Sequence, residues 1–571
     1  MKNKNKFIGV NFGGHDTSAT LLIDDNIVAA CEQERFDLLK HSRSFPLEAI
    51  NECLRIGKIS INDIDEISFG TDIFDLIREV YLKPALQDES RLKFLIKDIE
   101  KIKIFLNIEK RLRELTGFKG KVNFLRHHMC HLASTYYPSG FNNALVVSYD
   151  GMGEYETGMI GVGKNGKIRV LHDKVHYPHS LGLIYSAITF YLGWKHHCDE
   201  GIIMGLAPFG DYNENIPKQK KTYLDVFRDI IYQTSPLNYK INLDYISYHK
   251  KRDVWISEKF TSIFGPKREY GGKITKNFKN IAAALQKRIE EVVISQLKYC
   301  NKKYNQKKLC ISGGVGLNCS LNGKIVESKI FDEIFVQPAS GDAGISYGAA
   351  LLSSLKNKNK LKVSKNHNFY LGSSFQTNEI LDSIKKSKQK FEKPRDLLIK
   401  VANLLSEGKI VAWFQGKSEF GPRALGNRSI LSRPFPETQR DFINKKVKFR
   451  ESFRPFAPAV LNEMREEFFE INQESPHMLI ACNVKPSMKK KIPAVVHVDN
   501  SCRVQTVTFE SNEKFYLLIK EFYAITKCPV LLNTSFNVKG QPIVNTPKQA
   551  IDCFLSTNLD VLCIGEYLLK K

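Results

Sequence analysis

Three histidines fall within seven residues of this sequence, in the stretch RHHMCHL at positions 126–132. His127 and His131 are four residues apart, so on a helix their side chains would project from one face and could bind one metal ion. His128 and Cys130 would then be turned away from that face. Histidine pairs at this spacing also occur without metal on helix surfaces and in protein cores, so a metal site requires further ligands.

Two aspartates are candidates for those ligands. Asp150 ends the apolar run NALVVSYDG and Asp342 follows EIFVQPASG, each beside a glycine. Strand ends in α/β sheets deliver side chains into a cleft, so both carboxylates could meet there. Two histidines and two aspartates form a mixed nitrogen and oxygen set, which suits Fe(II), Mn(II) or Zn(II) better than a thiolate-binding metal. Alternatively, either aspartate caps a loop or forms hydrogen bonds beside a phosphate.

A glycine-rich segment, SGGVGLNCSLNGK at 312–324, comes directly after a predicted strand. The backbone N–H groups of Gly313, Gly314 and Gly316 could face phosphate oxygens. A structural turn would explain these glycines equally well. A second glycine-rich turn, GDAGISYGAA at 341–350, also follows a predicted strand. Two such turns favour a nucleotide cleft.

Strands and helices alternate along the chain and would position these residues. The runs FIGVNFGG and ATLLI flank the turn GGHDTS and predict an opening hairpin. Apolar residues at helical spacing predict a helix within 280–300. The pattern breaks in a Lys/Asn-rich stretch near 355–375, so we expect an α/β domain at 1–360 and a second, smaller α/β domain at 370–571. Residues 211–275 are more typical of an insertion or lid than of a third domain.

The composition restricts the class of protein. A chain of 571 residues requires more than one hydrophobic core. The 12 cysteines include no C-x-x-C pair, and no long apolar segment is present, so we expect a cytoplasmic protein with free thiols and no membrane association. The net charge of +24 suits phosphate-rich partners, either nucleic acid or small phosphorylated substrates.

Motifs along the whole chain resemble the O-carbamoyltransferase family of nodulation-factor and antibiotic biosynthesis. The first half contains GGHDTSA, HHMCH, SYDGMGE, DEGIIMGLAPFG, SGGVGLN and PASGDAG. The second half contains GKSEFGPRALGNRSIL, KFRESFRPFAPAVL, RVQTV and LLNTSFNVKGQPIVNTP. The resemblance implies an N-terminal actin/Hsp70-like double fold, similar to the tRNA threonylcarbamoyladenosine transferase. It also implies a C-terminal domain similar to threonylcarbamoyl-AMP synthase.

The family resemblance implies a reaction in two stages. The C-terminal domain would convert ATP, with Mg, and carbamoyl phosphate into carbamoyladenylate. The N-terminal domain would then transfer the carbamoyl group to a hydroxyl of a sugar or natural product. The family's metal positions match His127, His131, Asp150 and Asp342, and iron is the expected metal, with Mn or Zn as alternatives. We expect no stable nucleic acid complex, and a homodimer is compatible with the sequence.

Further residues are assigned by the same resemblance. His15 would accept the proton of the acceptor hydroxyl, unless it only orders its turn, and Lys40 would bind phosphate, unless it is a solvated lysine. In the extended conformation, Lys448 and Arg450 would share one face, as would Ser535 and Asn537. The expected nucleotide-binding residues are Gly313, Gly314, Asn318, Gly341, Lys448, Arg450, Ser535 and Asn537. The expected carbamoyl phosphate or phosphate ligands are Arg423, Arg428, Arg454 and Arg503.

Two positions depart from the family pattern. Ile202 stands where lysine is common and Gln541 where glutamate is common, which leaves substrate binding near those loops undefined.

Two other functions remain open. A tRNA-modifying enzyme would also suit the basic charge. A non-catalytic nucleotide-binding regulator would suit the fold but not the nearly complete metal and phosphate sets. The acceptor itself is not identified by the sequence.

Overall fold

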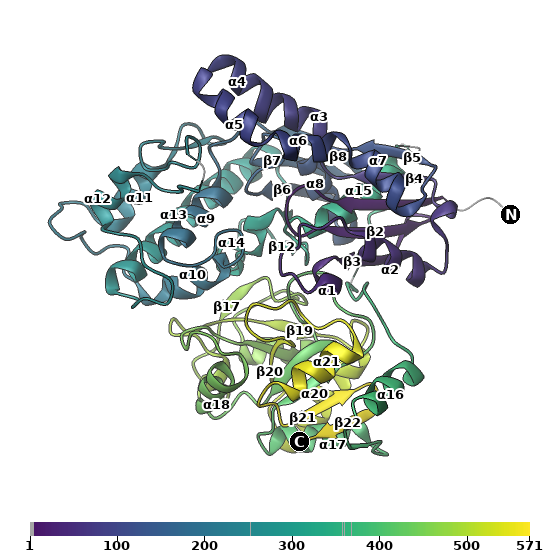
Figure 1. Ribbon diagram of the computed structural model, residues 1–571. Helices are drawn as coiled ribbons and strands as arrows, with labels where there is room; N and C mark the ends of the chain where they lie inside the picture. Colours follow the sequence, from purple (N-terminus) through teal and green to yellow (C-terminus); the bar gives the residue numbers. More distant parts are fainter. Residues whose placement is uncertain (1–4, 252, 357, 359, 367) are drawn as a thin grey trace. The chain divides into compact units, whose positions relative to one another are not determined.

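The computed structural model describes residues 5–251, 253–356, 358, 360–366 and 368–571 (Figure 1). The packing of its backbone divides the chain into two units. Unit 1 comprises Met1–Gln33 and Arg43–Lys365, and unit 2 comprises Glu34–Ser42 and Asn366–Lys571.

Unit 1 contains two five-stranded sheets. The first has the order β3-β2-β1-β4-β5, with strands β1 (Lys6–Asn11), β2 (Ser18–Ile23), β3 (Asn26–Glu32), β4 (Glu66–Phe69) and β5 (Lys121–Phe124). The second has the order β12-β11-β6-β7-β8, with strands β6 (Asn143–Tyr149), β7 (Gly158–Lys164), β8 (Lys167–His172), β11 (Lys308–Ser312) and β12 (Glu333–Val336).

Both sheets follow the same topology. In each, the first three strands form an antiparallel meander, and the two later strands add in parallel to the other side of the first strand. The predicted opening hairpin is the β1–β2 pair. This repeated arrangement is the actin/Hsp70-like double fold that the family resemblance implied.

Two helices link the sheets. α8 (His127–Tyr136) packs on β6 and β11, α15 (Ala343–Leu355) packs on β1 and β2, and the two helices pack against each other. Glycines permit this close approach. A Cβ atom on Gly9 would lie 2.0 Å from the carbonyl oxygen of Ser346, and one on Gly348 would lie 1.8 Å from that of Cys130. Side chains at these glycines would therefore separate the elements that carry the candidate metal ligands.

The long helix α13 (Lys276–Tyr304) contains the predicted helix, and the predicted apolar face is fully buried at Ile281, Leu285, Ile289 and Val292. Residues 211–275 belong to unit 1 and contain α11 (Tyr223–Ile230), β9 (Ile231–Gln233), β10 (Tyr239–Ile241) and α12 (Glu258–Phe264). α11 packs on α13. The remaining α-helices of unit 1 are α2 (Leu47–Gly57), α3 (Ile73–Leu76), α4 (Lys83–Gln87), α5 (Leu92–Lys97), α6 (Ile99–Leu106), α7 (Ile108–Thr116), α9 (Leu181–Tyr191), α10 (Glu200–Leu206) and α14 (Cys319–Glu327).

Unit 2 is built on a mixed eight-stranded sheet of order β13-β22-β21-β14-β15-β20-β16-β19. Its strands are β13 (Phe391–Glu392), β14 (Val411–Phe414), β15 (Arg428–Ser432), β16 (Ala457–Leu461), β19 (Gln505–Val507), β20 (Val530–Ser535), β21 (Val561–Ile564) and β22 (Tyr567–Lys570). A separate pair is formed by β17 (Ala481–Asn483) and β18 (Ser501–Arg503).

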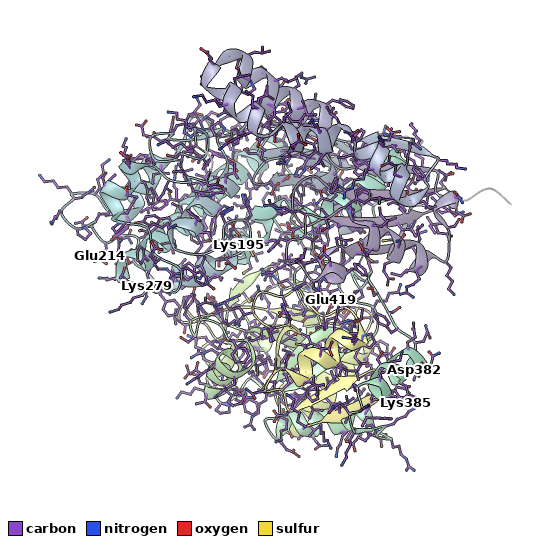
Figure 2. The ribbon with its side chains drawn as sticks, viewed as in Figure 1. Lys195, Glu214, Lys279, Asp382, Lys385 and Glu419 are labelled. Carbon is purple, nitrogen blue, oxygen red and sulfur yellow. The ribbon has the colours of Figure 1, made fainter. Side chains whose placement is uncertain are left out.

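The helices of unit 2 surround this sheet. They are α1 (Glu34–Asp37), α16 (Thr377–Lys386), α17 (Leu397–Ser406), α18 (Thr438–Phe442), α19 (Arg465–Phe468), α20 (Glu513–Thr526) and α21 (Pro547–Leu555). α16 buries Ile380 and Ile384 and exposes Asp382 and Lys385, which Figure 2 labels. Within the described residues, we find no helix with the length and apolar character needed to cross a bilayer.

The segment that contains Lys40 groups with unit 2, whereas the sequence assigned all of residues 1–360 to the first domain. Arg35 explains the difference. Its side chain is only 4% exposed, and its Nη2 donates a hydrogen bond of 2.7 Å to the carbonyl oxygen of Gly421. A buried arginine must keep its partners, so this contact fixes residues 34–42 in unit 2.

Candidate functional site

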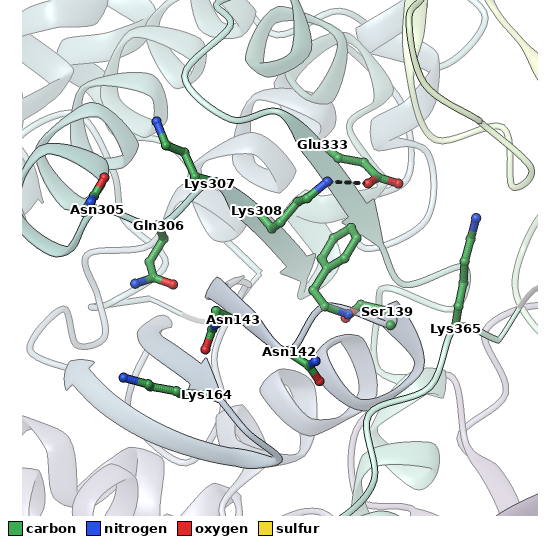
Figure 3. A pocket seen from close by; sticks show the side chains of 12 residues that line it. Ser139, Asn142, Asn143, Lys164, Asn305, Gln306, Lys307, Lys308, Glu333 and Lys365 are labelled. Carbon is green, nitrogen blue, oxygen red and sulfur yellow. Dashed lines mark hydrogen bonds and ion pairs between the residues drawn. The ribbon is translucent and has the colours of Figure 1, made fainter.

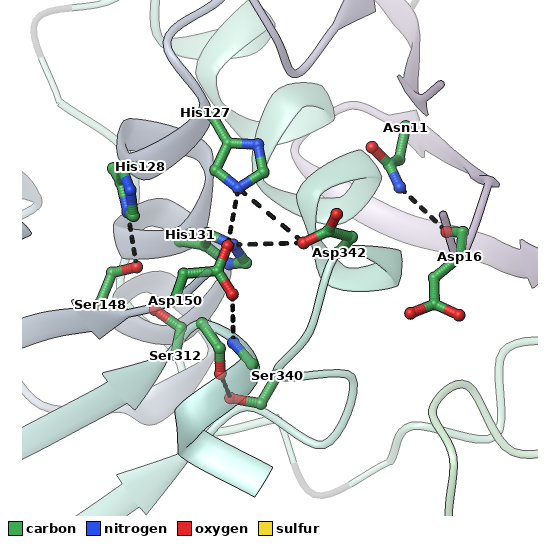
Figure 4. Close-up of polar contacts among 12 residues, drawn as sticks. Asn11, Asp16, His127, His128, His131, Ser148, Asp150, Ser312, Ser340 and Asp342 are labelled. Carbon is green, nitrogen blue, oxygen red and sulfur yellow. Dashed lines mark hydrogen bonds and ion pairs between the residues drawn. The ribbon is translucent and has the colours of Figure 1, made fainter. Parts of the chain in front are cut away.

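The four predicted metal ligands lie together in unit 1 (Figure 4). His127 and His131 are on the first turns of α8, Asp150 directly follows β6, and Asp342 directly precedes α15. One ligand atom from each residue lies within 4.8 Å of the others. The strand ends and helix starts of both halves of the double fold thus bring these side chains to one place.

The distances suit a metal ion. Asp150 Oδ2 is 3.1 Å from His127 Nε2 and 3.6 Å from His131 Nε2. Asp342 Oδ1 is 3.9 Å from His127 Nε2 and 4.0 Å from His131 Nε2. Bonds of about 2.1 Å to one ion would place neighbouring ligand atoms about 3.0 Å apart at a right angle and about 3.4 Å apart at a tetrahedral angle. The Asp150 distances are close to these separations, and the Asp342 distances are slightly longer.

The surroundings of His131 test whether these residues fit a metal ion. Its side chain is fully buried, and neither ring nitrogen has a hydrogen-bond partner among the described residues. Buried polar atoms in native proteins are normally paired, so a nitrogen that faces two carboxylates in this way is suited to a cation. The nitrogen and oxygen donors therefore fit an ion such as Fe(II), Mn(II) or Zn(II).

The local electrostatics also favour a cation. Burial alone would lower the pKa of His127, but its hydrogen bond to Asp150 and the charge of Asp342 outweigh burial and raise it to about 9. Burial raises the pKa of Asp342, and the charge of Asp150 acts in the same direction while His15 opposes it. Two buried carboxylates at one point require positive charge, which protonated His127 provides in part.

His128 and Cys130 are turned away from the metal ligands, as predicted. His128 Nδ1 lies 2.9 Å from Ser148 Oγ, and its Nε2 lies 3.0 Å from the carbonyl oxygen of Glu156. Cys130 is fully buried in an apolar cluster with Ile345 and Ala349. Neither residue joins the metal ligands.

Glu154 is a residue of the site that the sequence reasoning missed. Its Oε1 accepts hydrogen bonds from the backbone N–H groups of His127 (2.9 Å) and Asp72 (2.8 Å). Because it binds the first N–H group of α8, Glu154 fixes the position from which His127 projects. The only available signal was the acidic residue at the end of SYDGMGE.

The glycine-rich loop is joined to the metal site. Gly314 N–H donates a hydrogen bond of 2.7 Å to Asp150 Oδ1, so this donor is already used and does not face a phosphate. Gly313 has φ of +84°, and a Cβ there would lie 2.2 Å from the carbonyl oxygen of Tyr149. These two glycines thus hold the loop against the end of β6, which is the structural alternative to the predicted nucleotide role.

Asn318 and Gly341 were also predicted to bind the nucleotide, and their surroundings differ. Asn318 caps α14 through Leu321 N–H (3.0 Å) and exchanges hydrogen bonds of 2.9 and 3.1 Å with the side chain of Gln286. Its amide is therefore occupied by structural contacts. Gly341 has open space, since the nearest atom to a Cβ there would be a Leu317 methyl carbon at 3.9 Å. Gly341 remains compatible with a nearby ligand.

His15 lies beside the metal ligands. Its Nδ1 is 2.9 Å from Asp16 Oδ2 and 3.9 Å from Asp342 Oδ2. The turn is fixed by Asn11, whose side-chain Nδ2 donates to the carbonyl oxygens of His15 and Asp16 at 3.0 Å each. The structure therefore brings the proposed proton acceptor to the four-residue cluster.

A second cluster lies in unit 2. Lys448 Nζ lies 2.8 Å from the carbonyl oxygen of Ser535 and 3.3 Å from its hydroxyl. It also lies 2.9 Å from the carbonyl oxygen of Asn537 and 2.6 Å from its side-chain oxygen. The structure thus brings together three predicted residues, although Phe449 has φ of +48° and the Lys448–Arg450 segment is not extended as assumed.

Several positively charged side chains lie near Lys448. Burial, and then the charge of Arg450, lowers the pKa of Lys448, and Arg454 and Lys40 add to this effect. Burial and the charges of Arg454 and Arg503 also lower the pKa of Arg450. The repulsion between these positive charges decreases when an anion binds. We name Lys40, Lys448, Arg450, Arg454 and Arg503 the basic cluster.

Arg428 does not fit the predicted phosphate role. Its side chain is fully buried, and its guanidinium donates four hydrogen bonds to the carbonyl oxygens of Gln415, Asn427, Ser373 and Gly416. The guanidinium also lies over the ring of Phe414, 3.7 Å from its centroid. We therefore interpret Arg428 as a structural residue, because both of its Nη nitrogens donate to backbone carbonyl oxygens.

Glu419 orders the loop before Arg428 and was also missed. Its Oε1 accepts hydrogen bonds from the backbone N–H groups of Leu425, Asn427 and Arg428 at 2.8 to 3.1 Å. Arg423 lies in this loop and is partly exposed. The loop motif GPRALGN is thus held around a buried carboxylate.

The two departures from the family pattern have different settings. Ile202 is buried in α10 with 5% exposure, as its apolar side chain favours. Gln541 is exposed, and its backbone oxygen accepts a hydrogen bond of 2.8 Å from Asn537 Nδ2. Gln541 therefore contacts a residue that also binds Lys448.

A cavity of about 730 Å³ lies at the opposite end of the second sheet (Figure 3). It is lined by Asn143, Lys308 and Glu333, which begin β6, β11 and β12, whereas Asp150 and Asp342 follow the other ends of β6 and β12. Lys308 and Glu333 form an ion pair of 2.7 Å. None of the lining residues is a candidate site residue, so the cavity is separate from the metal centre.

Comparison with known proteins gives two family matches. Residues 6–351 match the family model described as the carbamoyltransferase N-terminus, and residues 402–571 match the carbamoyltransferase C-terminus. The two matches together cover nearly the whole chain.

Individual relatives are similar over their full length or most of it. An uncharacterized protein of Synechocystis sp. is 37% identical, with 99% of this chain and 96% of that protein covered. Nodulation protein NolNO of Sinorhizobium fredii is 35% identical, with coverage of 98% and 79%. An uncharacterized protein of Methanocaldococcus jannaschii is 30% identical, with coverage of 99% and 99%.

Proposed function

The chain belongs to the carbamoyltransferase family, and we therefore propose that it makes carbamoyladenylate from ATP and carbamoyl phosphate and transfers the carbamoyl group to a hydroxyl of a sugar or natural product. One observation carries the proposal most directly: the same chain holds a two-histidine, two-aspartate cluster in unit 1 and, in unit 2, the basic cluster around the buried Lys448. A regulator that only binds nucleotide would need neither the metal ligands nor the basic cluster.

Unit 2 performs the first stage. Carbamoyl phosphate loses phosphate to water and yields carbamate, whose oxygen then attacks the α-phosphorus of ATP and displaces pyrophosphate. Lys448 and Arg450 bind the phosphate oxygens as charge shifts to the leaving pyrophosphate, with Arg454 and Arg503 beside them. Ser535 and Asn537 hold the ammonium of Lys448 in position, because four of their oxygens surround it.

Unit 1 performs the second stage. The acceptor oxygen attacks the carbamoyl carbon, its proton moves to His15, and AMP leaves with the electrons of the broken carbon–oxygen bond. The contact of His15 Nδ1 with Asp16 assigns the proton to Nδ1 and the lone pair to Nε2, which is the form of histidine that accepts a proton.

His127, His131, Asp150 and Asp342 would hold the metal, for which Fe(II) is our first choice and Mn(II) or Zn(II) are alternatives. When bound, such an ion supplies Lewis acidity, which stabilises negative charge on phosphate or carbonyl oxygens. Glu154 and the Gly313–Gly314 loop keep the ligands in place, since they bind His127 N–H and Asp150 Oδ1.

Product analysis tests the proposal. The purified chain, loaded with Fe(II) and incubated with ATP, Mg and carbamoyl phosphate, is expected to release pyrophosphate and, with an acceptor, AMP and a product heavier by one carbamoyl group. Mass spectrometry of a panel of hydroxylated acceptors checks this. ATP consumption that requires threonine, or a tight RNA complex at physiological salt, would instead indicate a tRNA-modifying enzyme.

A further inference from the structure

Two cysteines face each other across the two-stranded ribbon of β17 and β18 in unit 2. Cys482 on β17, which Figure 1 labels, is the direct partner of Cys502 on β18 in the antiparallel register. Direct partners on antiparallel strands project from the same face of the ribbon, so the two side chains are neighbours. We name Cys482 and Cys502 the thiol pair.

The spacing of the ribbon suits a disulfide bond. Val484 N–H donates a hydrogen bond of 2.9 Å to the carbonyl oxygen of Asn500, two positions along the ribbon from the thiol pair. Hydrogen-bonded and non-hydrogen-bonded pairs alternate along an antiparallel ribbon, so the thiol pair is of the hydrogen-bonded kind, with Cα atoms about 5.5 Å apart. Disulfides most often join cysteines whose Cα atoms are about 5.5 to 6 Å apart.

The two thiols differ in their access to solvent. Cys502 is only 3% exposed, whereas Cys482 is partly exposed. All 12 cysteines lie in the described part of the chain, and only Cys198 and Cys482 among them are not buried. A reactant in solution therefore reaches Cys482 first, and Cys502 is the second thiol beside it.

The ribbon also carries Arg503 of the basic cluster. Arg503 follows Cys502 on β18 and is the register partner of Ala481, and its charge acts on Arg450. The Cβ atoms of direct partners lie about 4.5 to 5.5 Å apart, and a disulfide brings them to about 3.8 Å. Disulfide formation therefore shifts the strand that holds Arg503 by an amount on the order of 1 Å.

We propose that the thiol pair is a site of reversible oxidation, which forms an intramolecular disulfide with a small-molecule disulfide as oxidant and thereby slows the first stage in unit 2. The effect on the rate rests on the proposed function, whereas formation of the bond does not.

The oxidation takes two thiol–disulfide exchange steps, written here for oxidised glutathione. The Cys482 thiolate attacks one sulfur of the oxidant, so a mixed disulfide forms and one glutathione thiolate leaves. The Cys502 sulfur then loses its proton and attacks the Cys482 sulfur, and the second glutathione thiolate leaves with the electrons of the broken sulfur–sulfur bond. The two protons lost by the thiol pair are taken up by the two glutathione thiolates.

Peptide mapping tests the bond directly. The reduced chain is incubated with oxidised glutathione, its remaining thiols are alkylated in denaturant, and tryptic peptides are analysed by mass spectrometry without reduction. We expect a cross-linked peptide that contains Cys482 and Cys502, both in wild type and in the control Cys198→Ser, and we expect dithiothreitol to remove it. In Cys502→Ala, Cys482 should instead retain one glutathione. If both thiols of the pair are alkylated in wild type, or if Cys482 retains glutathione there, the inference is wrong.

Pyrophosphate release tests the effect on the first stage. Oxidised wild type is expected to release pyrophosphate at least about tenfold more slowly than reduced wild type, because Arg503 is displaced, and dithiothreitol should restore the rate. Cys482→Ser should keep its rate in oxidised glutathione. A cross-link that leaves the rate unchanged, or an equal loss in Cys482→Ser, would overturn the proposed effect on the first stage. A cross-link in a chain that releases no pyrophosphate even when reduced would contradict the proposed function alone.

Discussion

The ammonium nitrogen of Lys448 lies 2.6 Å from the side-chain oxygen of Asn537, although 89 positions separate the two residues in the sequence. Three further oxygens of Ser535 and Asn537 lie within 3.3 Å of the same nitrogen. These oxygens stabilise a charged ammonium that burial alone would disfavour. The nitrogen of Lys448 is therefore held in place in the absence of a ligand, as the proposed first stage requires.

Lys448→Ala should abolish the first stage. Without the ammonium, the phosphate charge loses a fixed partner, and we expect pyrophosphate release from ATP and carbamoyl phosphate to fall at least about 10²-fold. Freshly made carbamoyladenylate should restore transfer, because unit 1 is unchanged. Lys445→Ala is the control, since Lys445 lies three residues away and is exposed. Full activity of Lys448→Ala, or failure of added adenylate to restore transfer, would contradict the two-stage mechanism.

His15→Ala should have the opposite effect. As the proposed acceptor of the hydroxyl proton, His15 is expected to contribute about 10² to 10⁴-fold to transfer, while pyrophosphate release continues at the wild-type rate. Single-turnover transfer from preformed carbamoyladenylate measures the step directly. A histidine that only orders the turn would leave this rate nearly unchanged when replaced by glutamine, so His15→Gln separates the two roles.

The sequence predicted the elements that carry a strong repeating pattern. The opening hairpin was predicted from two apolar runs that flank a glycine-containing turn, and the buried face of α13, from Ile281 to Val292, was predicted from its helical spacing. The convergence of His127 and His131 also follows from helix geometry, since their spacing fixes a common face. Local rules suffice where a residue's neighbours in sequence are also its neighbours in space.

The sequence could not predict roles that depend on distant contacts. Arg428 resembles a phosphate ligand in its motif, yet both of its Nη nitrogens donate to the carbonyl oxygens of residues 373, 415, 416 and 427. Glu154 and Glu419 bind backbone N–H groups through side-chain oxygens, and no periodicity marks such residues. The position of Cys482 opposite Cys502 depends on the register of β17 and β18 and was likewise not predicted.

His131→Ala should remove the metal. The loss of one of four ligands weakens the ion's hold, so elemental analysis after dialysis is expected to find less than about one tenth of the wild-type metal. His128→Gln is the control on the same helix, because both ring nitrogens of His128 pair with Ser148 and Glu156 and neither faces the carboxylates of the cluster. Equal metal content in His131→Ala and wild type would remove His131 from the ligand set.

Arg428→Met should reduce stability more than it affects phosphate binding. The substitution leaves four carbonyl oxygens without their buried donor, and we expect the free energy of unfolding to fall by about 3 kcal/mol. Urea unfolding followed by circular dichroism measures this. Arg454→Met should change stability by less than about 1 kcal/mol, because the Arg454 side chain is 30% exposed. An unchanged unfolding midpoint in Arg428→Met, with loss of pyrophosphate release, would restore the phosphate role.

Asp499 should make unit 2 sensitive to acid. Burial alone would raise the pKa of Asp499, but hydrogen bonds from His497 and Ser501 outweigh burial and lower it to about 2. A carboxyl group with a lowered pKa in the folded state contributes stability that is fully present above the unfolded pKa of about 4 and is lost as the pH falls toward 2. The Asp499 side chain is 42% exposed, so solvent screening limits the contribution to about 1 kcal/mol. Urea unfolding of wild type and Asp499→Asn between pH 5 and about pH 2.5 should therefore show a difference that shrinks with acid. A constant difference across this range would mean that the charge of Asp499 does not stabilise the fold.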